Sequence, residues 1–77
     1  MIIYKIVKED HCISTSQHYT SFGIAAIDSI SGNQCEYVED VFLDYDTAKE
    51  YISVFNEEQL DLIHLYDVID DILHLCL

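Results

Sequence analysis

The sequence predicts an α+β fold, in which a three-stranded antiparallel meander is packed by two C-terminal helices in the order β-β-β-α-α. Two observations predict it: β-branched and aromatic runs with short links fill the first half, and apolar residues at helical spacing fill the second. With 77 residues, no proline and two glycines, we expect one domain over residues 1–77 with few breaks. The expected elements are strands at about 2–8, 19–30 and 34–42, and helices at about 45–56 and 62–75.

The strands are predicted from their residue types and from the links between them. The first run is rich in isoleucine, valine and tyrosine, and the polar, aperiodic residues 9–18 predict a loop or a loose hairpin connection. Gly23 lies within the second strand and indicates a bulge or a close backbone approach. A Ser-Gly-Asn turn signal precedes the third strand. Links this short favour antiparallel pairing, because parallel strands need long crossovers.

The helices are predicted from apolar residues that recur with a helical period. In the first helix these residues are Ala48, Tyr51, Ile52 and Phe55. Either Asp44 or Asp46 can cap its start, and Thr47 with Glu50 offers an alternative capping box. Asp61 is a candidate cap for the second helix. The apolar stripe of that helix is Leu62, Leu65, Val68/Ile69, Ile72 and Leu73/Cys76.

Acidic residues dominate the charge of the chain. Fifteen aspartates and glutamates face three lysines, no arginine is present, and the net charge is −12. Residues 36–71 hold twelve of the acids and one lysine, within a stretch that is also rich in apolar residues. The charge therefore coats a folded surface, because disordered acidic segments are poor in apolar residues. Such a surface repels nucleic acids and anionic membranes and attracts basic protein surfaces.

Three segments resemble a family of small bacterial proteins of unknown function. They are the Phe-Gly-Ile-Ala strand within residues 19–26, the Glu-Asp-Val strand within 38–41, and the His-Leu-Tyr-Asp-Val-Ile-Asp-Asp helix within 62–73. The similarity covers residues 19–73. It implies strands followed by helices and a bacterial or phage origin, and it implies no activity or catalytic residue.

Metal and cofactor sites are not predicted. His11-Cys12 and His74-x-Cys76 could supply four zinc ligands if the two ends of the chain met, but the spacing is not that of a standard zinc module. Cys76 also lies on the apolar stripe of the second helix. Three cysteines at scattered positions indicate free thiols. No signal peptide or membrane-length apolar run is present in the sequence, so we expect a cytoplasmic protein, in a bacterium or a phage-infected host cell.

Catalytic residues are not predicted either. His64 and His74 lie near the aspartates of the second helix, but a solvated helix face explains this arrangement without a cleft. Cys12 beside His11 is the only local suggestion of a nucleophile and base, and neighbours in an extended chain point apart. Glycine-rich phosphate loops are also missing from the sequence. The sequence therefore favours a non-enzymatic protein without a cofactor.

The predicted function is an acidic module that binds a basic protein surface. Its most concrete version is an inhibitor that mimics nucleic acid and occupies the basic groove of a nuclease, such as a CRISPR or restriction effector, because helical carboxylates recur at about the phosphate spacing of DNA. The alternative is a bacterial housekeeping protein that acts by oligomerisation or regulatory protein binding. Neither direct nucleic-acid binding nor membrane binding is expected. The candidate partner-binding residues are Glu36, Glu39, Asp40, Asp67, Asp70 and Asp71.

Overall fold

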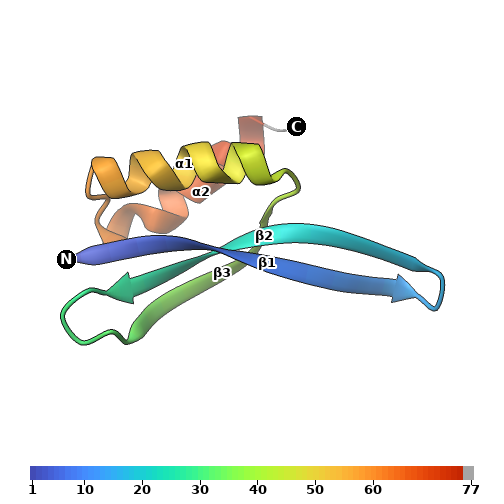
Figure 1. Cartoon of the computed structure of the whole chain (residues 1–77). Coiled ribbons are helices and arrows are strands. Elements are labelled where there is room, and N and C mark those ends of the chain that lie inside the picture. Colours follow the sequence, from blue (N-terminus) through green and yellow to red (C-terminus); the bar gives the residue numbers. More distant parts are fainter. Residues whose placement is uncertain (76–77) are drawn as a thin grey trace.

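A computed structural model describes residues 1–75 of the chain. The elements are β1 (Ile2–Ser14), β2 (Gln17–Asp28), β3 (Gln34–Phe42), α1 (Tyr45–Glu57), a 3₁₀ turn (Leu62–His64) and α2 (Leu65–Leu75). The strands form one antiparallel sheet in the order β1-β2-β3, and Figure 1 shows both helices on the same face of it. The predicted β-β-β-α-α fold is confirmed. Within residues 1–75, none of the helices has the length and apolar character needed to cross a bilayer.

Residues 9–18 form a β-hairpin, so the predicted loop is wrong and the predicted alternative, a hairpin connection, is confirmed. β1 continues to Ser14, a two-residue turn follows, and β2 begins at Gln17, two residues before the predicted start. This part of the hairpin lacks the alternation of apolar and polar residues by which strands are recognised in a sequence. Its strands are joined by contacts between polar side chains instead, such as the hydrogen bond from the Thr20 hydroxyl to Asp10 at 3.1 Å. β3 pairs with β2 only from Phe22 to Ile27, so β1 and β2 continue without it toward their hairpin turn. Figure 1 shows that this end of the hairpin also projects beyond the helices.

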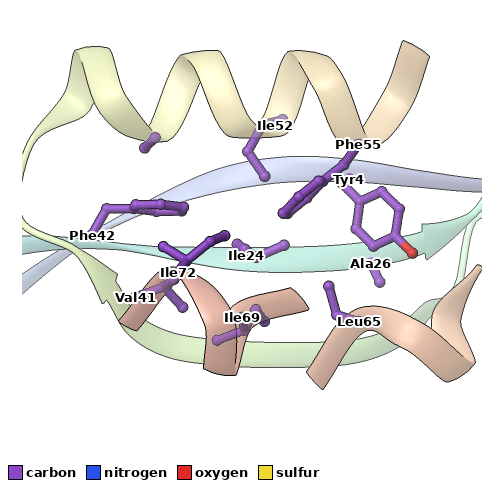
Figure 2. Close-up of a cluster of buried hydrophobic side chains, with 11 residues drawn as sticks. Tyr4, Ile24, Ala26, Val41, Phe42, Ile52, Phe55, Leu65, Ile69 and Ile72 are labelled. Atoms are coloured by element: carbon purple, nitrogen blue, oxygen red, sulfur yellow. The ribbon is translucent and has the colours of Figure 1, made fainter. Parts of the chain in front are cut away.

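The core lies between one face of the sheet and the two helices. In the first half of β1 and the second half of β2, the even-numbered residues face the helices because side chains alternate along a strand. Tyr4 is 1% exposed; its hydroxyl donates to the Leu60 carbonyl at 2.7 Å, and its ring meets Phe55 edge-on. Figure 2 shows the cluster, which comprises Tyr4, Ile24, Ala26, Val41, Phe42, Ala48, Ile52, Phe55, Leu65, Ile69 and Ile72.

Both ends of α1 are fixed by local hydrogen bonds. The Asp44 side chain caps the first turn by accepting from the Thr47 N–H at 2.9 Å, which confirms one of the predicted caps. At the other end Gln59 has a left-handed φ of 53°, and the Leu60 N–H returns to the Phe55 carbonyl at 3.0 Å. This Schellman-type ending reverses the chain. The chain then passes through the 3₁₀ turn, so the predicted second helix starts as an α-helix at Leu65 and not at residue 62.

The outer edge of β1 is covered by a side chain of α1. Asn56 accepts a hydrogen bond from the Tyr4 N–H at 2.8 Å and donates one to the Tyr4 carbonyl at 3.0 Å. A single amide therefore pairs with both edge groups of Tyr4, as a neighbouring strand would. The contact also ties the last turn of α1 to the sheet.

Candidate functional site

A network of polar side chains lies on the face of the sheet opposite the helices. At its centre is Glu9 of β1, whose side chain is 10% exposed. Its carboxylate accepts hydrogen bonds from the Ser21 hydroxyl at 3.1 Å, from the Asp40 N–H at 2.8 Å and from the Tyr37 hydroxyl. Residues from all three strands thus contact one carboxylate. We call Glu9 and its hydrogen-bond partners the Glu9 network.

Gly23 provides the space for the Glu9 network. A Cβ atom at this position would lie 2.7 Å from the Val38 carbonyl oxygen, 3.1 Å from Glu9 Oε2 and 3.1 Å from Tyr37 Cε1. Tyr37 and the Glu9 carboxylate therefore lie against the bare backbone of β2, an arrangement known for aromatic residues that cover strand glycines. The predicted close backbone approach at Gly23 is confirmed.

A bulge in β3 directs Asp40 toward this network. Ile24 is paired with Val38 and Phe22 with Phe42, so β3 spends two more residues than β2 over this stretch. Asp40 has a φ of 57°, in the left-handed region that aspartate tolerates better than most residues. Its N–H then points to Glu9 instead of to β2.

The Glu9 network also sets the protonation of its members. Burial alone would raise the pKa of Glu9, but the hydrogen bonds from Tyr37, Asp40 and Ser21 and the attraction of His11 outweigh it and hold the pKa below its ordinary value. Glu9 is therefore ionised at neutral pH. The hydrogen bond between Tyr37 and Glu9 raises the pKa of Tyr37 to about 12, together with burial and the charges of Glu9 and Glu39.

His11 and Tyr19 extend the network toward the hairpin. Their rings are stacked with centroids 4.4 Å apart, and His11 Nε2 lies 2.7 Å from the Ser21 hydroxyl. Because the Ser21 proton goes to Glu9, the hydroxyl accepts from His11 and is not activated by it. Ser21 is also fully buried. The trio of serine, histidine and glutamate therefore holds the carboxylate in place and does not form a nucleophile with its base.

A groove of about 440 Å³ opens beside the network, at the end of β3. Tyr19 stands at its edge and donates a hydrogen bond to the Asp40 carboxylate at 3.3 Å. Leu43 and Leu73 are 75% and 42% exposed. The groove joins β2, the β3–α1 connection, the first turn of α1 and α2, and its lining consists of Tyr19, Asp40, Val41, Phe42, Leu43, Asp44, Thr47 and Leu73.

Consecutive residues of β3 shape the floor of the groove. Val41 and Phe42 are both buried, although neighbours in a regular strand face opposite sides. The bulge at Asp40 allows both to enter the core and leaves Leu43 on the surface. At the rim, hydrogen bonds from the Thr47 N–H and hydroxyl lower the pKa of Asp44 despite a smaller effect of burial. Asp44 is therefore ionised at neutral pH.

The six predicted partner-binding residues are divided between β3 and α2. Asp40 belongs to the Glu9 network and the groove. Glu36 lies beside Tyr66 of α2. The pKa of Tyr66 is raised by its hydrogen bond to Glu36, by burial and by the negative charge of Glu36. The remaining four side chains are exposed, Glu39 on β3 and Asp67, Asp70 and Asp71 on the outer face of α2. His74 Nδ1 lies 3.7 Å from Asp70 Oδ1 and donates a hydrogen bond to the Asp70 backbone carbonyl at 2.8 Å. This hydrogen bond raises the pKa of His74, and so do the charges of Asp70 and Asp71.

Four residues could supply zinc ligands but are not predicted to bind metal, and those that the structure describes do not form a common site. His11 belongs to the Glu9 network, whereas Cys12 is exposed and its thiol contacts the Ser14 carbonyl at 3.1 Å. Cys76 lies outside the described residues. Among residues 1–75, histidine, cysteine and acidic side chains do not form a group of three that could hold a metal ion.

The chain is matched by one family model over almost its whole length. This model covers residues 1–75. The chain belongs to DUF6514, a family of unknown function. Membership confirms the resemblance to an uncharacterised family. Comparison with the curated proteins and with the solved structures gave no match.

Proposed function

We propose that the protein is a non-enzymatic binding module in the cytoplasm whose partner presents a basic protein surface. One observation carries the proposal: within residues 1–75 the only ion pairs are those of His11 and His74, so no lysine neutralises a carboxylate at contact distance. With a net charge of −12, the folded chain repels itself. A basic partner would relieve that repulsion. The negative charge of the chain would also attract such a partner to the surface and speed its association.

The finer form of this proposal is nucleic-acid mimicry. Asp67, Asp70 and Asp71 are exposed on one helix, where residues three and four apart are about 5–6 Å from each other. This spacing supports binding to a groove that normally holds a phosphate backbone, as in a nuclease of a CRISPR or restriction system. An inhibitor of phage origin would be one such protein.

The test is the salt dependence of a complex with a purified partner obtained by affinity capture. Between about 50 and about 500 mM salt, the affinity should fall by about tenfold or more, because screening removes the attraction between opposite charges. Changing Asp67, Asp70 and Asp71 together to Asn should slow association, while Glu57→Gln at the end of α1 serves as a control. DNA should compete with the protein for the partner under the mimicry proposal. An affinity that hardly changes with salt would contradict the proposed function.

The second candidate is self-association or regulatory binding through apolar surface. The exposed Leu43 and Leu73 beside the groove favour it. Sedimentation equilibrium at high and low salt separates the two. Dimerisation that strengthens as salt screens the like charges would support this candidate over the first.

A further inference from the structure

The groove at the end of β3 combines two kinds of surface, apolar side chains and carboxylates. Leu43 and Leu73 contribute exposed apolar side chains, from positions thirty residues apart in the sequence. Asp40 and Asp44 contribute carboxylates to the same lining, which contains no basic residue. A volume of about 440 Å³ is within the range of pockets that bind small ligands or single large side chains.

The geometry around the groove is fixed before anything binds. Asp40 is held by its backbone bond to Glu9 and by the Tyr19 hydroxyl, and Asp44 is held by the cap of α1. Both carboxylates therefore need little further ordering to meet a cation. Their acceptor capacity is not exhausted, because a carboxylate offers about four lone-pair sites.

Charge decides which occupant fits. A second copy of this chain also carries −12, and its three lysines cannot offset the repulsion. A nucleic acid or an acidic lipid would be repelled for the same reason. An apolar ligand without charge would leave the two carboxylates unpaired. A protein segment with a bulky apolar side chain next to lysine or arginine satisfies both the apolar wall and the carboxylates.

We propose that this groove is the docking site for such a basic-apolar peptide segment of the partner, with the apolar side chain between Leu43 and Leu73 and the cation at Asp40 and Asp44. The inference rests on the proposed function, because it assigns the basic partner to a specific place on the acidic surface. It adds that apolar contact, and not charge alone, fixes where the partner binds.

The experiment uses a synthetic hexapeptide, acetyl-Gly-Lys-Leu-Phe-Lys-Gly-amide, titrated into the full chain and followed by amide chemical shifts. One control peptide replaces both lysines by glutamine, and another replaces leucine and phenylalanine by alanine. Leu43→Ser and Asp40→Asn should each raise the dissociation constant about tenfold. Asn tolerates the left-handed backbone at position 40, so this variant removes charge without adding strain. The matched controls, Ile63→Ser at an 82% exposed position and Glu57→Gln, should change it less than about twofold.

The outcomes separate this inference from the proposed function. If all basic peptides bind but Leu43→Ser has no effect, and the triple change of Asp67, Asp70 and Asp71 weakens binding instead, the groove is refuted and the acidic module stands. If neither the peptide nor a captured basic partner binds at low salt, both fail. Equal binding of the glutamine peptide would overturn the choice of a basic occupant. A dimer that Leu43→Ser abolishes would assign the groove to a second copy and overturn the proposal.

Discussion

Replacing Gly23 by alanine should destabilise the protein, although the same change stabilises many proteins. Where an alanine fits, it gains up to about 1 kcal/mol by restricting the unfolded chain. Here the new methyl group would lie 2.7 Å from the Val38 carbonyl, a backbone atom that can retreat only if β3 moves. Overpacking of this kind costs about 1–3 kcal/mol, and Glu9 and Tyr37 would also be displaced. We expect a net loss of about 1–2 kcal/mol.

Thermal and urea denaturation followed by circular dichroism measure this loss. In a domain of this size about 1 kcal/mol lowers the Tm by about 4–8 °C. Gly32 provides the matched control, because it has open space around it but a φ of 77°. Gly32→Ala should therefore be costly and Gly32→Asn much less so, whereas Gly23→Asn should be at least as harmful as Gly23→Ala. A Gly23→Ala protein as stable as the parent would refute the packing of Glu9 and Tyr37 against β2.

Three further predictions test other parts of the fold. Leu65→Ala should cost about 2–5 kcal/mol in urea denaturation because Leu65 is fully buried, while Ile63→Ala at an exposed position should change stability by less than about 0.5 kcal/mol. Asn56→Ala should cost about 1–3 kcal/mol and speed amide exchange at Tyr4, because both edge groups of Tyr4 lose their partner; unchanged exchange would argue against the cap. Tyr37 is protonated up to a pKa of about 12 in the folded state but only to its ordinary value of 10.0 when unfolded, so its contribution is complete below pH 10.0 and is lost toward about pH 12. Urea denaturation between about pH 9 and about pH 12 should show a larger loss of stability in the parent than in Tyr37→Phe, which keeps Tyr66 with its raised pKa. An equal loss in both proteins would contradict this role of Tyr37.

The order of the elements could be predicted from the sequence because apolar spacing decides it. Leu65, Ile69 and Ile72 recur at helical intervals and are buried together in α2. Asp44 was one of the candidate caps because a short acidic side chain before an amphipathic run can accept the first free N–H groups. These are local signals, and each depends on a few neighbouring residues.

The Glu9 network could not be predicted because its members pair across strands. Glu9, His11, Tyr19 and Ser21 alternate on one face of the hairpin, but polar alternation without apolar partners resembles a loop. The one sequence signal for the hairpin is that these residues lie at nearly matching distances on either side of the turn at Thr15-Ser16. The groove depends on the left-handed φ of Asp40 and is lined by residues thirty positions apart, and spacing along the chain encodes neither feature.

The amide of Asn56 limits how copies of this protein can join through their sheets. An incoming strand cannot pair with Tyr4 on the outside of β1 unless it first displaces the last turn of α1. Addition of a strand at this point of β1 is therefore blocked by one side chain. Edge strands that are left open can template fibrils, so the amide of Asn56 protects this end of the sheet against that kind of growth.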